Sequence, residues 1–184
     1  MVVIDKFKNN LIHFTVFLTG ACVLVIEIVA VRLLSPFFGN TIFTMSGVIT
    51  VILMSLSLGY YFGGKISDKH PKITWFYSLI LISGIFVVAI NLLNIIITPL
   101  INYFFSFSVG PIISSFVLFF VPSLLLGMIS PYAIKVYNTI YPDKGIGSVT
   151  GEMFFWSTFG SITGSLLTGF LLIPNLGINI IFAT

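Results

Sequence analysis

The chain has 184 residues, of which 58% are hydrophobic and only 7% are charged. Soluble domains carry roughly a quarter of charged residues, so this composition, with a mean hydropathy of +1.16, excludes an ordinary soluble domain. It predicts an all-α integral membrane protein built as a polytopic helical bundle. The formal net charge of +3 is small and is informative through its placement. A single cysteine, Cys22, excludes an intrachain disulfide.

Apolar stretches of membrane-spanning length follow one another along the chain. About 20 apolar residues suffice for a helix to cross a bilayer. We expect full spans over residues 11–34, 43–66, 73–97, 110–136 and 147–173, and the beginning of a sixth over residues 177–184. Ser35-Pro36 should end the first span and Thr98-Pro99 the third, which leaves residues 100–107 as an interfacial helix or a loop. Residues 1–184 thus form a single transmembrane domain.

The basic residues fall on one side of this five-helix arrangement. Only Arg32 lies toward the other side, whereas seven of the eight Lys and Arg residues share the side of the N-terminus: Lys6, Lys8, Lys65, Lys69, Lys72, Lys135 and Lys144. The positive-inside rule then places the N-terminus and the lysine-rich loops of a multi-pass cell-membrane protein in the cytoplasm. The first apolar run continues to Leu34 without a small-x-small cleavage site, so it is expected to remain as a helix.

Glu27 lies well inside the first apolar stretch, and Arg32 follows it five residues later. A charged group at membrane depth is costly, so Glu27 must face protein, a cavity or a partner. The two side chains are about 140° apart around a helix and roughly 7.5 Å apart along it, which disfavours an ion pair. Arg32 can instead reach the outer interface, and it is also a candidate ligand for a substrate or an ion. Glu27 is either a site for a proton, an ion or a cationic substrate, or a carboxyl group that fixes helix packing.

Small residues repeat every four positions in two of the expected helices. Such rows let helix backbones approach closely and indicate packing more often than a binding site. The second helix carries Ser55, Gly59 and Gly63, and the fifth carries one row of Ser157, Ser161, Ser165 and Gly169 beside another of Gly160, Gly164 and Thr168.

Polar and kinking residues mark further positions. Glu152 lies near the cytoplasmic start of the fifth helix, where the helix dipole favours a negative charge, and it is also a candidate ligand for a substrate or an ion. Trp156, one turn on, shapes a cavity mouth, where it is a further candidate binding residue, or fills a gap. Pro122 and Pro131, with Gly127 between them, predict kinks in the fourth helix, and broken helices often border transporter sites.

Several chemistries have no counterpart in the sequence. It lacks a glycine-rich phosphate loop, a Ser/His/Asp triad and a cluster of His, Cys and carboxylates, and His70 alone does not make a metal site. Nothing indicates nucleic-acid binding. We therefore expect a chain that is not an enzyme by itself and that has no catalytic residue, metal or cofactor.

Four segments together resemble the membrane domain of membrane-bound spermidine synthase-like proteins, in which a major-facilitator-like part is fused to an aminopropyltransferase-like domain. They cover nearly the whole chain: Glu27-x-x-Ala30-x-Arg32-x-x-x-Pro36-x-x-Gly39; Leu58-Gly59-Tyr60 through Gly63-Gly64 and Asp68; Leu126-Gly127 through Ser130-Pro131; and Gly147 to Gly151 followed by Thr158-Phe159-Gly160-Ser161-x-x-Gly164 and Gly169. The second segment is also similar to the loop motif that follows the second helix of major facilitators.

The resemblance implies a membrane module that anchors or feeds a missing or separate aminopropyltransferase-like domain or subunit and that handles a polyamine or another cationic amine. Two alternatives stay open. The chain can be a small major-facilitator-like transporter that works as a dimer, with Glu27 as its coupling carboxylate. It can also be an accessory structural subunit of a larger membrane complex. All three imply a lipid bilayer and a homo- or hetero-oligomer.

Overall fold

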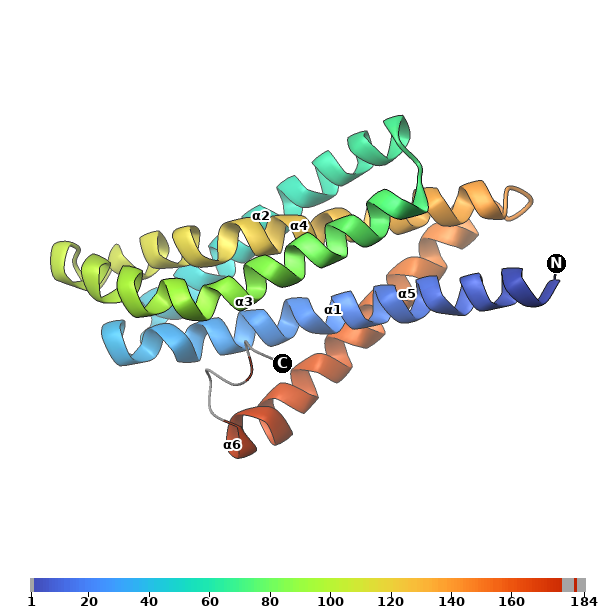
Figure 1. Ribbon diagram of the computed structural model, residues 1–184. Coiled ribbons are helices and arrows are strands. Elements are labelled where there is room, and N and C mark those ends of the chain that lie inside the picture. The colour runs from blue at the N-terminus through green and yellow to red at the C-terminus, as the bar shows by residue number, and fades with distance from the viewer. Residues whose placement is uncertain (1, 177–180, 182–184) are drawn as a thin grey trace.

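The computed structural model describes the backbone of residues 2–176 and 181, and the side chains from residue 10 onward. Its elements are α1 (Val2–Phe38), α2 (Ile42–Lys69), α3 (Ile73–Phe104), α4 (Gly110–Ile140), α5 (Ile146–Leu167), the π-helical turn η1 (Thr168–Leu172) and the short α6 (Ile173–Asn175) (Figure 1). Within this part of the chain, 5 helices are long and apolar enough to cross a membrane. The protein is thus all-helical, as its composition predicts.

Two helices extend beyond the prolines that were expected to end them. α1 continues past Pro36 to Phe38, and α3 continues past Pro99 to Phe104. A proline disturbs the turn that precedes it, because it clashes with the carbonyl group four residues earlier, and it leaves the residues that follow free to remain helical. The expected separate element over residues 100–107 is therefore wrong for its first half, which is the last turn of α3.

One helical irregularity is not among those expected from the sequence. The described chain widens into a π-helical turn at Thr168–Leu172, where the Thr168 hydroxyl donates to the Gly164 carbonyl oxygen at 2.7 Å. α4 runs as one helical element through Pro122 and Pro131, and the kinks expected at these prolines stay a prediction. The expected sixth span over residues 177–184 lies outside the described residues, apart from Ile181.

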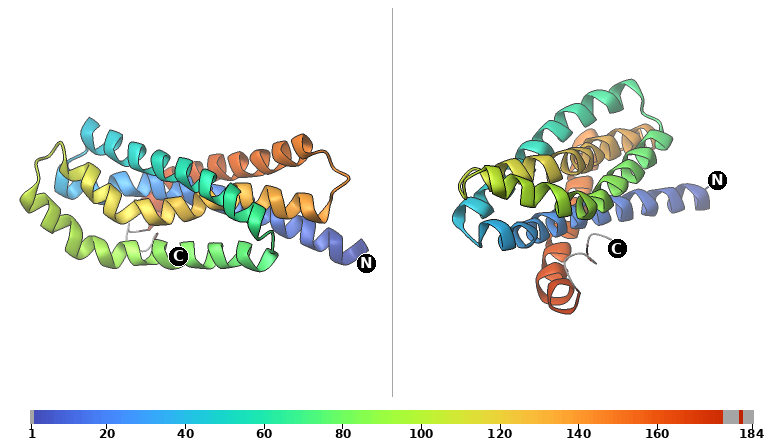
Figure 2. Two further views of the ribbon diagram at one scale, coloured as in Figure 1. Left: turned by 90° about the horizontal axis from the view of Figure 1, so that it is seen from above. Right: turned by 60° about the vertical axis from the view of Figure 1, so that its left-hand side comes forward.

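α4 is the central helix and packs against α2, α3, α1 and α5. In the apolar stretch of 18 residues that marks each span, 56% of the residues of α4 are buried inside the protein, whereas the share is 17% for both the α3 span and the span that begins with α5. Figure 2 shows α3 and α5 on opposite sides of the bundle, and Figure 1 shows α5 crossing α1 obliquely. The bundle core comprises mainly aliphatic and aromatic side chains, among them Leu34, Ile52, Phe76, Leu118, Phe119, Ile129 and Tyr132.

Glycines mediate the two closest helix contacts. On α2, a Cβ at Gly63 would lie 2.6 Å from the Met128 carbonyl oxygen of α4, and one at Gly59 would overlap the Leu124 carbonyl oxygen. On α5, a Cβ at Gly164 would lie 2.6 Å from the Ala21 carbonyl oxygen of α1, and one at Gly160 would overlap the Phe17 carbonyl oxygen. These distances place backbone against backbone, the arrangement that small-residue rows produce in membranes.

Only part of the small-residue row of α5 contacts α1. The Ser161 hydroxyl donates to the Gly20 carbonyl oxygen of α1 at 2.9 Å, so the row does pack there. Ser165 is half-buried, whereas Gly169 is exposed and a Cβ built on it meets no described atom within 4 Å. The part of the chain that the structure describes thus gives Gly169 no packing partner, although the turn that contains it still touches α1, and a packing role for Gly169 stays a prediction.

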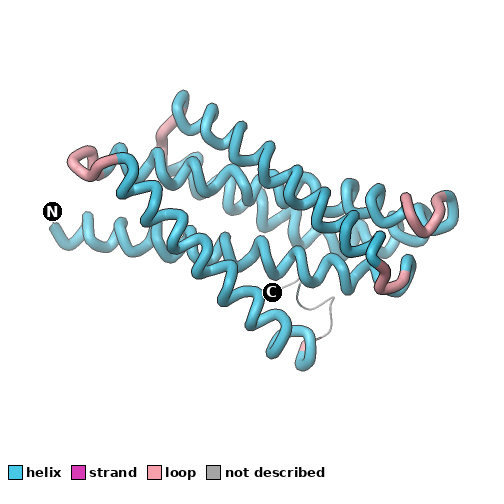
Figure 3. Tube along the Cα trace, turned by 180° about the vertical axis from the view of Figure 1, so that it is seen from behind, coloured by secondary structure: helices cyan, strands magenta, loops and turns pink. Residues whose placement is uncertain are grey.

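One end of the bundle, which we call the lysine-rich end, collects the N-terminus and the α2–α3 and α4–α5 connections (Figure 3). The Asp68 carboxylate and the Lys135 ammonium form an ion pair of 2.8 Å between α2 and α4. The Tyr132 hydroxyl donates to the His70 carbonyl oxygen and ties α4 to the α2–α3 connection. The helix directions therefore gather the lysines as the five-span arrangement predicts.

Replacing Gly160 by alanine should destabilise the protein, because the added Cβ would overlap the Phe17 carbonyl oxygen and separate α1 from α5. Overpacking of this kind costs about 1–3 kcal/mol. Gly169→Ala, in open space on the same helical path, should have a much smaller effect. Thermal unfolding in mild detergent, followed by size-exclusion chromatography, measures both variants. Equal losses would show that the α1–α5 contact does not depend on Gly160.

Candidate functional site

A cluster of polar side chains lies at the lysine-rich end, where α1, α4 and α5 meet. His13 Nε2 on α1 lies 2.9 Å from Glu152 Oε1 on α5. Lys144, in the α4–α5 connection, places its Nζ 3.2 Å from Glu152 Oε2 and 2.8 Å from the Tyr137 hydroxyl of α4. One carboxylate thus meets two basic groups, one at each oxygen.

Aromatic rings hold His13 in position. Its ring meets that of Tyr137 edge-on at a centroid distance of 5.2 Å and that of Trp156 at 5.9 Å. The side chain of His13 is only 8% exposed, whereas that of Glu152 is 32% exposed. His13 Nε2 and Glu152 Oε1 lie within ion-pair distance, but their geometry is not that of an aligned hydrogen bond. His13 is therefore a buried base that faces a carboxylate reachable from outside.

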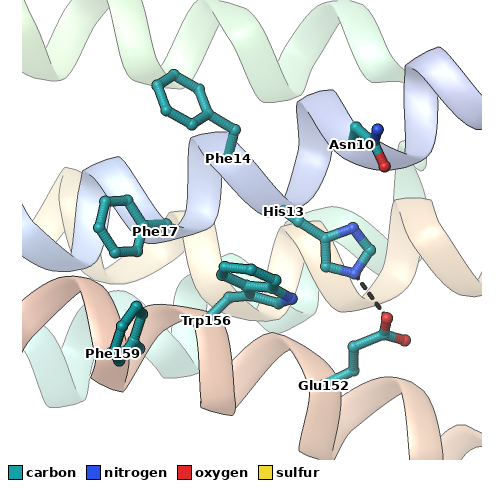
Figure 4. A pocket seen from close by; sticks show the side chains of 7 residues that line it. All are labelled: Asn10, His13, Phe14, Phe17, Glu152, Trp156 and Phe159. Carbon is teal, nitrogen blue, oxygen red and sulfur yellow. Dashed lines mark ion pairs between the residues drawn. The ribbon is translucent and has the colours of Figure 1, made fainter.

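The helix crossing brings these residues together. Phe17 follows His13 by one turn on α1, and it is the residue against which Gly160 of α5 packs. The α1–α5 register set there places Glu152, two turns before Gly160, opposite His13. Trp156 lies between these levels, and Figure 4 shows its ring beside the His13–Glu152 pair.

Lys144 lies outside the membrane-spanning segments, and its pKa is raised. The hydrogen bonds to the Tyr137 hydroxyl and to Glu152 favour its charged form. The Nζ atom also lies 5.1 Å from the centroid of the Tyr137 ring and 5.9 Å from that of Tyr141. The site thus already seats an ammonium group between a carboxylate and aromatic faces.

An open groove of about 490 Å³ runs past this cluster between α1 and α5 (Figure 4). It combines one carboxylate with several aromatic walls and two further polar groups: Asn10, His13, Phe14, Phe17, Glu152, Trp156 and Phe159. A negative charge beside aromatic faces binds organic cations. Among the described residues, no three His, Cys, Asp or Glu side chains gather as a metal site.

The other expected site residues lie apart from this groove. Glu27 is half-buried in the middle of α1, and no ion pair or hydrogen bond joins its carboxylate to the described part of the chain. Arg32 is exposed nearer the opposite end of the bundle. The structure therefore brings Glu152 and Trp156 into one site and leaves Glu27 and Arg32 outside it.

The chain matches no protein-family model, no curated protein and no solved structure. The resemblance to spermidine synthase-like membrane domains thus rests on the sequence motifs, and the function has to be argued from the site itself.

His13 is not among the site residues predicted from the sequence. Its signal was present, because an ionisable ring inside an apolar run is a candidate functional residue by default. Its partner was not visible, since Glu152 lies far along the chain and meets His13 only through the helix crossing.

The charge on Lys144 should contribute to stability until the pH becomes strongly alkaline. A raised folded pKa means that this contribution is complete below the ordinary lysine value of about 10.4 and disappears as the pH rises through the raised value. The effect should be small, because the side chain is 44% exposed. Thermal unfolding between pH 9 and 12 should show an alkaline decline that is shallower in Lys144→Met than in the wild type. An unchanged decline in this variant would assign it to other groups.

Proposed function

We propose that the chain is the membrane module of a spermidine synthase-like system, which anchors an aminopropyltransferase-like domain or subunit and presents a cationic amine to it. The observation that carries the proposal is the groove beside Glu152, with its carboxylate among aromatic walls. The sequence motifs support the same assignment. The positive-inside rule assigns the lysine-rich end to the cytoplasm, where a soluble partner would find this groove.

The seating of Lys144 supports an amine as the ligand. Its primary ammonium group occupies the place that an amine substrate would take, with a carboxylate oxygen at 3.2 Å and aromatic rings beside it. An incoming amine would replace Lys144 at Glu152 Oε2 and extend its alkyl chain along the aromatic walls. The groove volume of about 490 Å³ lies within the range of small-molecule sites.

The lysine-rich end also supports an anchoring role. It exposes the Asp68–Lys135 pair, whose side chains are 69% and 39% exposed, beside a second cavity of about 200 Å³. Lys65, Lys69 and Lys72 lie at the same end and are exposed. A soluble partner with an acidic face would complement this surface.

The test measures binding of spermidine to the full chain in lipid nanodiscs. Glu152→Gln should weaken binding at least tenfold, because it removes the charge but keeps the shape, and about 1.4 kcal/mol corresponds to that factor. The matched control is Asp68→Asn, which neutralises another carboxylate at the same end and should leave the affinity unchanged. Absence of binding in the wild type, or equal loss in both variants, would contradict the proposed amine site.

A second candidate function is a small transporter that acts as a dimer, and one observation favours it. Glu27 is a half-buried carboxylate within a span, and it has no partner among the described residues. A group that couples transport to a proton or an ion is expected to lie in such a place. If this candidate is right, proteoliposomes should take up amine, and Glu27→Gln should abolish uptake while Arg32→Gln should not. Uptake that survives Glu27→Gln would remove Glu27 from this role.

A third candidate is an accessory subunit of a larger membrane complex. α3 and α5 have the same buried share of 17%, yet the mean hydropathy of their windows is 2.7 and 1.3, respectively. The open side of α5 exposes large apolar side chains, among them Phe155, Phe159 and Ile162, which a protein neighbour could cover. The mass of the intact particle in mild detergent separates the candidates: a stoichiometric soluble partner supports the module, a homodimer the transporter, and a monomer counts against the subunit.

A further inference from the structure

The contact between His13 and Glu152 joins two helices just beyond the point where they cross. At the crossing, Gly160 of α5 packs against the backbone of Phe17, one turn from His13. This close contact contains no titratable group. On the lysine-rich side of the crossing, the two helices form the walls of the groove, and His13 and Glu152 bridge them at 2.9 Å. The backbone contact at the crossing therefore does not respond to pH, whereas the His13–Glu152 contact beside it involves two titratable side chains.

The surroundings of His13 make the strength of its contact with Glu152 depend on whether His13 is charged. Its neighbours are the Tyr137 ring from α4 and the Trp156 ring from α5, and the charged group that faces it is Glu152. Lys144 from the α4–α5 connection meets the same carboxylate at its other oxygen. Histidine is the side chain that ordinarily changes its charge between about pH 5 and 8. Because His13 is only 8% exposed, solvent and salt screen its attraction to Glu152 less than that of an exposed pair.

We propose that His13 is a proton-controlled latch on the groove. When His13 is protonated, it attracts Glu152 Oε1, holds the groove walls of α1 and α5 together and leaves both carboxylate oxygens occupied. When His13 is neutral, this attraction is lost, the walls separate on the lysine-rich side of the crossing, and the groove beside Glu152 opens to a ligand. Acid thus closes the site, and neutral or mildly alkaline pH opens it. The latch rests on the site proposed above but not on the identity of its ligand.

The experiment measures the distance between α1 and α5 in the full chain, in lipid nanodiscs and without any amine. Nitroxide labels replace Leu11 and Phe154, which are 40% and 53% exposed and lie on the two helices near the groove. Cys22→Ser removes the single native cysteine. Pulsed electron spin resonance should give a shorter and narrower distance distribution at pH 5 than at pH 8. A reference pair at Leu53 and Val117, on α2 and α4, should not change with pH.

Three variants decide the assignment. In His13→Gln the distribution should resemble that of the wild type at pH 8 at every pH. In His13→Arg, which is always charged, it should resemble that at pH 5 and so supports the latch even if His13→Gln fails to fold. His70→Gln changes the only other histidine, which is exposed in the α2–α3 connection, and should keep the wild-type response.

Two results would overturn the latch: a wild-type distance that does not change with pH, or a change that persists in His13→Gln. Because the readout needs no ligand, failure of spermidine binding leaves this result standing, and a failed latch leaves the amine site standing.

Discussion

The close approach of helix backbones at glycine is the constraint on which the rest of the structure depends. Lipid provides no hydrophobic force between helices, so association relies on close packing and interhelical hydrogen bonds. Gly59 and Gly63 bring α2 onto α4, and Gly160 and Gly164 bring α5 onto α1. The second contact also fixes the α1–α5 register. His13 faces Glu152 because this register brings their side chains to 2.9 Å, His13 one turn and Glu152 two turns from the contact of Gly160 with Phe17.

The polar groups near the end of the bundle have partners, whereas one in the middle of a helix has no described partner. At the lysine-rich end, Glu152 is shared by His13 and Lys144, and Asp68 pairs with Lys135. These charges have partners and partial access to water, so their placement is favourable. Glu27 is the exception, because it lies in the middle of α1 without a described partner. A carboxyl group in that position is either neutral or met by something outside the described chain.

Sequence predicts the number and order of the spans well, because the length of an apolar run is set by the bilayer. It predicts the ends less well, since Pro36 and Pro99 allow the helix to continue. The small-residue rows are visible in sequence, but the helix geometry decides which members of a row make contact, and Gly169 meets no described atom. Glu152 and Trp156 were recognisable as unusual residues. Their pairing with His13 was not, because it depends on how α5 crosses α1.

The position of Lys144 has a consequence for selectivity. Lys144 is tethered eight residues from Glu152 along the chain, so its ammonium group acts as a built-in competitor at the carboxylate. Short flexible tethers give effective concentrations in the millimolar range. A free amine that binds at Glu152 has to displace this intramolecular ligand, so an amine with a single charge and no apolar contacts gains little. An amine with a second charge or a longer alkyl chain gains contacts along the groove that Lys144 does not make. In the proposed amine site the tether would therefore set a threshold that favours abundant, extended amines over traces of small ones.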